Sequence, residues 1–181
     1  MNFPDSDFWN YSIQVYQIPQ VEQACLGLQN TFAADVNLLL YCCWAGENKV
    51  QLSLDNIQQL ITTAQPWQNI IQPLRDSRQL LKNEVTALDN RIAIETSNNL
   101  KEMELNAEHM SQLAIEKALD LTSMQQARAP SSHYASNNTA LYLLQLDSVA
   151  SLSEVSELLT QLLDAIYQDP ETIQSTLMTM A

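Results

Sequence analysis

Residues 35–46 read DVNLLLYCCWAG, and this stretch decides the fold. Its apolar residues cover every face of the helix that it predicts, which places that helix at the centre of a bundle. The stretch is too short to span a bilayer. Asp35 is placed to cap the first turn, and Gly46 offers a stop just after the last turn. The residues that we expect to be almost fully buried are Leu39, Leu40 and Cys43.

Two amphipathic helices are predicted before this central helix. Within residues 5–17, apolar side chains recur at helical spacing, and Pro19 closes the segment. A second helix follows Pro19 and carries a single buried stripe. The residues of that stripe are Val21, Ala24, Cys25 and Leu28.

A further pair of helices is predicted directly after the central one. Leu52, Ser53 and Ile57 stand at the N′, N-cap and N4 positions of a hydrophobic staple. We expect this helix to end at Gln65, because the residue before a proline avoids the helical region. Pro66 would then open the next helix, and Pro73 would kink or split it.

Residues 74–129 contain neither Gly nor Pro, and their apolar residues recur at a spacing typical of a coiled coil. They form either an antiparallel hairpin or one very long helix. The polar run ETSNN at 95–99 interrupts the repeat, and Asn99 with Glu102 resembles a capping box. We therefore place a break near this run and favour the hairpin.

The clearest predicted loop is RAPSSHYASNN at 128–138, which also fits a boundary between two parts of the chain. Three short helices follow it, with cap signals at Ser151 and Asp169. The fold class is all-α: a multi-helix bundle of eight or nine helices with a long coiled-coil-like segment. We expect residues 1–129 to form the helical core domain and residues 130–181 to pack on the same core.

Composition excludes several classes of protein. The 181 residues include only two glycines, too few for the turns of an all-β fold. Lys and Arg number 8 against 21 Asp and Glu, so the net charge of −13 opposes binding to nucleic acid. No apolar stretch is long enough for membrane insertion, and the cysteines suggest neither a disulfide framework nor a zinc site. We expect a soluble, cytoplasmic protein.

Three sets of residues could bind a ligand or react, and for each set we favour a purely structural role. Glu95, Glu102, His109 and Glu116 repeat every seven residues, but they lack the Glu-x-x-His spacing of metal-binding bundles, so a solvated helix face is preferred. Cys42 and Cys43 read as inert core thiols, since no cation is near them in sequence. Asp35 and Asn37 read as a helix cap and a buried amide.

Arg75, Arg78 and Lys82 form the candidate partner-binding or anion-binding site. Their spacing keeps them on one helix face, and half of the eight cations lie within residues 75–91 of an acidic chain. A patch that binds an acidic partner requires at least two of the three heads to be exposed and unpaired. The alternative is that they pair internally, with Asp76, Glu84 or Asp89, or with the acidic C-terminal helices.

Several stretches resemble an uncharacterised family of all-helical proteobacterial proteins, over residues 8–146. The most specific are FW, ACLGLQ, DVNLLLYCCW and PW…PLR; ELNAEH and YLLQL also match. The resemblance implies a bacterial cytosolic setting and a helical fold. The family has no assigned activity, so the resemblance carries over no catalytic residue.

These observations favour an acidic helical interaction module, adaptor-like, that docks to another protein or to itself through its helices. We expect it to carry no catalytic activity, metal or cofactor, although an enzyme with an undescribed site stays open. The alternative function is binding of a small molecule or lipid tail in an aromatic pocket between the N-terminal helices. The aromatic residues for that pocket are Trp9, Tyr11, Tyr16, Tyr41, Trp44 and Trp67.

Overall fold

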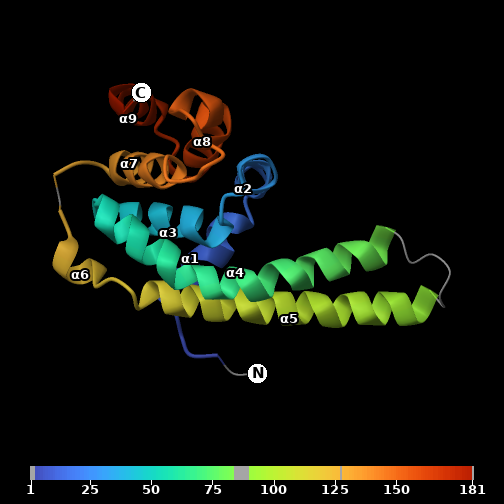
Figure 1. Cartoon of the computed structure of the whole chain (residues 1–181). Helices are drawn as coiled ribbons and strands as arrows, with labels where there is room; N and C mark the ends of the chain where they lie inside the picture. The colour runs from blue at the N-terminus through green and yellow to red at the C-terminus, as the bar shows by residue number, and fades with distance from the viewer. Residues whose placement is uncertain (1–2, 84–89, 127, 181) are drawn as a thin grey trace.

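The computed structural model describes residues 3–83, 90–126 and 128–180. Within these ranges the chain is all-helical, which confirms the expected fold class, and it forms nine helices without a strand (Figure 1). The helices are α1 (Asp7–Tyr16), α2 (Pro19–Phe32), α3 (Val36–Glu47), α4 (Leu54–Asn83), α5 (Asn90–Glu116), α6 (Leu121–Met124), α7 (Ser131–Leu143), α8 (Leu152–Tyr167) and α9 (Pro170–Met180). None of them is long and apolar enough to cross a membrane.

Helix α3 is the buried centre, as the sequence predicted. Leu39, Leu40 and Cys43 are all at most 3% exposed, and Asp35 caps the helix by accepting a hydrogen bond from the Asn37 N–H. Gly46, however, is not a stop: it lies inside the helix, and its φ is not positive. Glycine is needed there for close packing, because a Cβ would stand 2.5 Å from the backbone N of Ala135 on α7.

The predicted loop at 128–138 is wrong, because α7 begins at Ser131 and occupies most of that stretch. Its hydroxyls are satisfied inside the helix: Ser136 donates to the Ser132 carbonyl and Thr139 to the Ala135 carbonyl. Small side chains let α7 approach α3 closely. Polar residues at these positions therefore serve helix packing, and only Arg128–Pro130 precede the helix.

Helix α4 is continuous from Leu54, so the predicted end at Gln65 and the split at Pro73 are also wrong. Pro66 and Pro73 are seven residues apart and therefore share one helix face, and both are exposed. The carbonyls that lose a donor to the two prolines lie on the same outer side, where water can reach them. The inner face is then free to pack without interruption, as at Ile71, which is fully buried.

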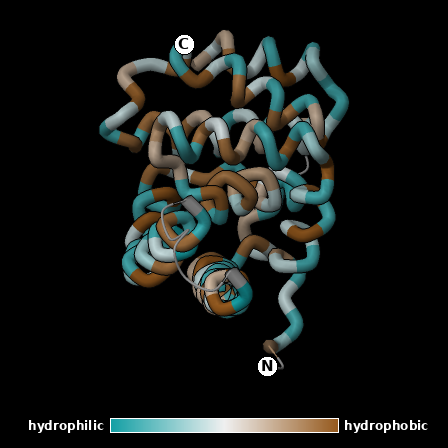
Figure 2. Tube along the Cα trace, turned by 90° about the vertical axis from the view of Figure 1, so that its right-hand side faces the viewer, coloured by the Kyte–Doolittle hydropathy of each residue, from teal (hydrophilic) through white to brown (hydrophobic). Residues whose placement is uncertain are grey.

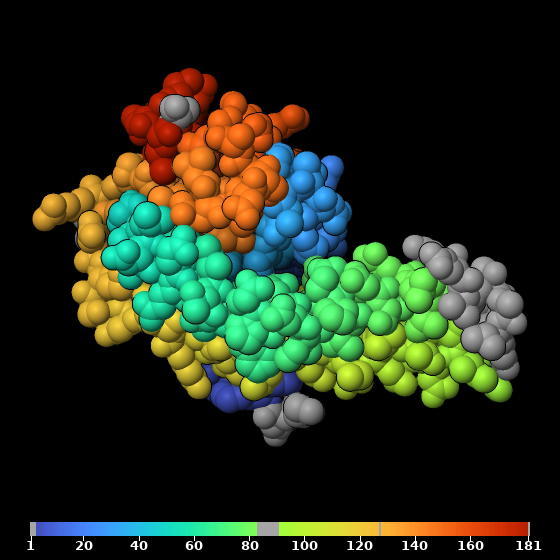
Figure 3. Space-filling model, viewed as in Figure 1, coloured from blue at the N-terminus to red at the C-terminus, as the bar shows by residue number. Residues whose placement is uncertain are grey.

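The expected hairpin is present, but its turn is not at residues 95–99. Helix α5 runs through ETSNN from Asn90 to Glu116, and Asn99 and Glu102 lie in its interior. Helices α4 and α5 lie antiparallel along their length, and their far halves extend well beyond the other helices (Figures 1 and 3). Figure 2 shows this hairpin nearly end on, beneath the layer that holds α3 and α7.

The helices other than α4 and α5 are called the body below. One hydrophobic cluster joins them, from Phe8 on α1 to Ile173 on α9. Helices α8 and α9 begin where the cap signals predicted. At α9 the Asp169 side chain accepts a hydrogen bond from the Thr172 N–H. At α8 the Ser151 side chain makes no capping bond, and Glu154 accepts from the Ala150 N–H instead. The projecting half of the hairpin lies outside this cluster. The base of the hairpin meets the body at α1, α3 and α7.

Candidate functional site

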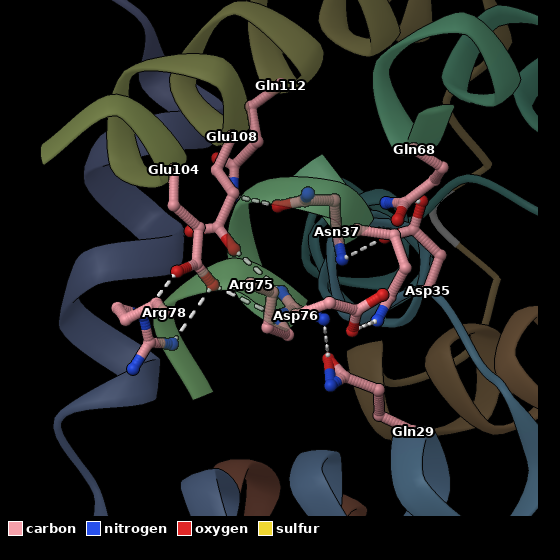
Figure 4. Close-up of polar contacts among 11 residues, drawn as sticks. Gln29, Asp35, Asn37, Gln68, Arg75, Asp76, Arg78, Glu104, Glu108 and Gln112 are labelled. Carbon is pink, nitrogen blue, oxygen red and sulfur yellow. Dashed lines mark hydrogen bonds and ion pairs between the residues drawn. The ribbon is translucent and has the colours of Figure 1, made fainter. Parts of the chain in front are cut away.

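Two of the three predicted cations are engaged in ion pairs within the hairpin. The Arg75 Nε lies 2.9 Å from Glu104 Oε1, and its Nη2 lies 3.0 Å from Glu108 Oε1. The Arg78 Nε lies 2.7 Å from the other Glu104 oxygen. A third nitrogen of Arg75 donates to the Gln29 side chain on α2, across 2.9 Å. Arg75 therefore ties the hairpin to the body (Figure 4).

A patch that binds an acidic partner requires exposed and unpaired cations, and Arg75 and Arg78 do not meet this requirement. Their partners are Glu104 and Glu108 on α5, which the sequence reasoning did not name as acceptors. Lys82 is exposed in the last turn of α4 and makes no ion pair with a described residue. A role of the three cations in partner binding stays a prediction, and Lys82 is the only head that is placed for it.

Asp35 occupies the junction between the body and the hairpin. Its Oδ1 accepts from the Asn37 N–H at 2.9 Å, and its Oδ2 accepts from the Gln68 side chain of α4 at 2.7 Å. Its own N–H donates to the hydroxyl of Tyr142 on α7, also at 2.7 Å. The helix cap predicted from the sequence is confirmed. The carboxylate also joins α3 to α4, and the backbone N–H of the same residue adds the link to α7.

A buried amide pair lies beside this carboxylate. Gln112 on α5 donates through Nε2 to Asn37 Oδ1 at 2.7 Å, which confirms the expected buried bond of Asn37. Gln112 is only 3% exposed, yet its Oε1 has no hydrogen-bond partner among the described residues. Buried polar atoms are nearly always paired, so this oxygen is an exception that requires a reason.

These residues line a groove of about 1280 Å³ between the body and the base of the hairpin. Eleven of its lining residues are asparagine or glutamine, and α4 alone supplies Gln65, Gln68, Asn69, Gln72 and Gln79. Carboxamides both donate and accept hydrogen bonds. Figure 4 shows Arg75 in the middle of this lining, with Glu104 and Glu108 on one side and Gln29 on the other.

The carboxylates of the groove do not share one electrostatic state. Burial raises the pKa of Asp35, against the opposing effect of its hydrogen bonds from Asn37 and Gln68. Burial likewise raises the pKa of Glu108, and the charge of Glu104 adds to this while Arg75 opposes it. For Glu104, hydrogen bonds from Arg78 and Arg75 outweigh the effect of burial, so its pKa is lowered.

The comparison with protein families gives one result. A family model for proteins of unknown function, DUF2390, matches residues 7–115, which is more than half of the chain. The chain belongs to the DUF2390 family. No curated protein and no solved structure matches it. The matched range, here called the DUF2390 segment, includes α1 to α4 and nearly all of α5, and thus most of the groove. It stops short of YLLQL, which the sequence resemblance included.

Within the DUF2390 segment, His109 is not part of a solvated face. Its ring is stacked on Trp9, at a centroid distance of 3.9 Å, and contacts the tilted ring of Phe3 at 4.2 Å. Burial lowers the pKa of His109. Glu116, just beyond the segment, accepts a hydrogen bond from the Phe8 N–H. Only Glu95 and Glu102 of that set are exposed, and the described residues contain no cluster arranged to hold a metal.

The cysteines of the segment and the aromatic residues Phe8, Tyr41 and Trp44 belong to its core. Cys42 and Cys43 are at most 1% exposed, and burial raises the pKa of both thiols, which is the opposite of what a reactive thiol needs. Phe8 packs edge-on against Tyr41 at 5.2 Å and tilted against Trp44 at 5.4 Å. Of the aromatics proposed for a pocket, Trp9 and Tyr16 line the groove.

Sequence reasoning missed most of the groove, although a signal was present. Glu104, Glu108 and Gln112 recur every four residues and so form one polar stripe on α5. Gln65, Gln68, Gln72 and Gln79 form a similar stripe on α4. Two polar stripes on helices that pair in a hairpin indicate a polar surface on that hairpin. Gln29 and Tyr142 carried no such signal, because they reach the groove from distant parts of the chain.

Proposed function

We propose that this protein is a cytoplasmic interaction module without catalytic activity, and that it holds a segment of another protein against the α4–α5 hairpin and the groove at its base. The proposal rests on the projection of the hairpin past the body (Figure 3). It rests also on the apolar side chains that are exposed on the two helices of the hairpin. The large apolar residues that are at least two-fifths exposed on α4 and α5 are Leu54, Ile70, Leu80, Ile92, Ile94, Met103, Leu105 and Met110.

Apolar side chains gathered on one element mark an interaction surface better than scattered ones do. Ile94 and Leu105 are eleven residues apart, which is about three helical turns, and they therefore share one face of α5. Leu105 lines the groove. Across from it, Ile13 of α1 and Leu26 of α2 also line the groove and are partly exposed. A partner segment that enters the groove would meet an apolar rim and continue along the hairpin.

The alternative function, binding of a small molecule or lipid tail, receives less support from the geometry. Tyr41 and Trp44 are packed against Phe8 and against each other. The groove that does contain Trp9 and Tyr16 is rich in amides and charges, which suits a polar ligand better than a lipid tail.

Site-specific photo-crosslinking inside bacterial cells tests the proposal. A photoreactive amino acid is placed at Ile94 or at Leu105, and in a control at Met178 of α9, which is 67% exposed but remote from the hairpin. We expect one discrete protein adduct from the two hairpin positions and none from the control.

Three results would contradict the proposal. The first is no adduct from either hairpin position, and the second is the same adducts from Met178. The third is an adduct of twice the chain's own mass, which would assign the face to self-association instead. Native mass spectrometry of the purified protein gives a further check, since a bound mass of small-molecule size would favour the alternative function.

A further inference from the structure

The floor of the groove offers hydrogen-bond acceptors without matching donors. Gln112 Oε1 is buried and unpartnered, and Ser12 Oγ, on a residue that is 3% exposed, is also unpartnered among the described residues. Both residues line the groove. The Glu108 carboxylate is engaged by Arg75 through one oxygen. The Ser12 hydroxyl can donate or accept, whereas Gln112 Oε1 can only accept, so a ligand that satisfies Gln112 has to donate a hydrogen bond.

The charges of the floor add a second requirement. Asp35, Glu104 and Glu108 face only two guanidinium groups, those of Arg75 and Arg78, and these already donate to Glu104, Glu108 and Gln29. Glu22 and Lys101 also line the groove, one of each sign, so they leave the balance unchanged. One negative charge is in excess. Burial raises the pKa of both Asp35 and Glu108, and a cation bound beside them would oppose this effect.

The volume and the lining residues of the groove indicate which class of ligand would supply a positive charge. Pockets for small molecules usually hold roughly 300–1,000 Å³, and this groove holds about 1280 Å³. The amides of α4 and the body can pair with both the N–H and the C=O of an extended polypeptide. The apolar rim of Ile13, Leu26 and Leu105 suits neighbouring side chains of such a segment.

We infer that the groove binds an extended polypeptide segment whose basic side chain enters between Asp35 and Glu108 and donates to Gln112 Oε1. This inference rests on the proposed interaction function and names the chemistry of the partner. A guanidinium group fits the site well, since it presents five N–H donors in a planar array and stays charged at any pH of interest.

The test compares two end-capped fluorescent peptides by anisotropy with the full chain. One alternates arginine and leucine; in the other, each arginine is replaced by citrulline, which keeps the shape and loses the charge. We expect the arginine peptide to bind at least about tenfold more tightly, as charge-assisted hydrogen bonds are worth more than neutral ones. Glu108→Gln should remove that preference, and Gln112→Met should weaken it.

The matched control is Glu157→Gln, which removes the same charge from an exposed position on α8 outside the groove. It should change the affinity for the arginine peptide by less than about twofold, because long-range attraction is screened by salt. Thermal melts show whether each variant is folded. A weaker preference for the arginine peptide in Gln112→Met, with an unchanged melt, supports the inference.

Equal affinity for the two peptides, no binding of either, or a loss on Glu157→Gln that equals the loss on Glu108→Gln would overturn the inference. These outcomes are distinct from a failure of the proposed function. If the crosslinks from Ile94 and Leu105 persist while the peptides are not distinguished, only the basic-segment inference falls.

Discussion

Arg75 and Glu104 hold the two long helices together from inside, with the guanidinium Nε 2.9 Å from the carboxylate Oε1. Only 8% of the Glu104 side chain is accessible to solvent, and Arg78 occupies its second oxygen. Removing Arg75 leaves the buried Glu104 with Arg78 as its remaining cation, and it takes away the ion pair of Glu108. This ion pair gives Arg75 a structural role whose contribution to stability can be measured, while partner binding by Arg75, Arg78 and Lys82 stays a prediction.

Arg75→Met should lower the free energy of unfolding by about 2 kcal/mol, which is typical for loss of hydrogen bonds to a charged group. Lys82→Met, on the same helix face but exposed, should change it by less than about 0.5 kcal/mol. Chemical denaturation measures both. Under the patch hypothesis, charge reversal of Arg75 and Arg78 leaves the melting temperature nearly unchanged; the observed ion pairs predict a clear drop instead.

Neighbouring carboxylates should give opposite pH dependences. The pKa of Glu104 is lowered in the folded state, so its ionisation favours folding above its unfolded pKa, and that contribution is lost as the pH falls through the folded value. The pKa of Glu108 is raised, so its contribution is fully present below the unfolded pKa and is lost as the pH rises through the folded value. The unfolded pKa of Glu is about 4.3.

The measurement is the difference in stability between the wild-type protein and each Gln variant across the acidic range. Relative to Glu104→Gln, the wild-type protein should gain stability as the pH rises toward about 4.3. Relative to Glu108→Gln, it should lose stability as the pH rises above about 4.3. Parallel curves for the two variants would show that the two carboxylates are not in different states.

Gly46→Ala should destabilise the protein by about 1–3 kcal/mol, the usual cost of overpacking. The new Cβ would meet the backbone of Ala135, which cannot move without displacing α7. Gly27→Ala is the matched control, since its Cβ would meet only the end of the Leu158 side chain, at 2.9 Å. The better helix propensity of alanine offsets that contact. Similar thermal melts for the two variants would contradict the close packing of α3 on α7.

Leu39→Ala should lower the free energy of unfolding by about 2–5 kcal/mol, because Leu39 is fully buried in the central helix. Met178→Ala removes an apolar side chain that is 67% exposed and should change stability by less than about 0.5 kcal/mol. Calorimetry of the two variants decides the point. An unchanged melt for Leu39→Ala would mean that α3 is not the centre of the core.

Helices with a strong apolar stripe could be predicted from the sequence, since burial of such a stripe depends on local spacing. The predicted buried residues Val21, Ala24, Cys25 and Leu28 all have no exposed surface. The failures share another cause. At Pro66 and across 131–138, local propensity argued for a break, and packing against distant helices outweighed it. At Asn99, a capping pattern occurs in the interior of a helix.

The candidate site was harder to predict than the fold. Arg75 and Arg78 were identified by charge, but their partners on α5 are 26 to 33 residues away, and the position of the turn decides which carboxylates face them. A break at 95–99 would have put Glu104 elsewhere. The link from Arg75 to Gln29 spans 46 residues and follows from no local pattern.

The position of α7 sets the limits of any fragment that can be produced alone. The DUF2390 match ends at residue 115, whereas α7 begins at Ser131 and covers α3. Asn138 on α7 also donates to the Val50 carbonyl and accepts from the Leu52 N–H, so it closes the connection from α3 to α4. A recombinant fragment cut at the family limits would expose the most apolar helix of the protein and should aggregate. We therefore expect the smallest fragment that folds by itself to be longer than the segment by which the family is recognised.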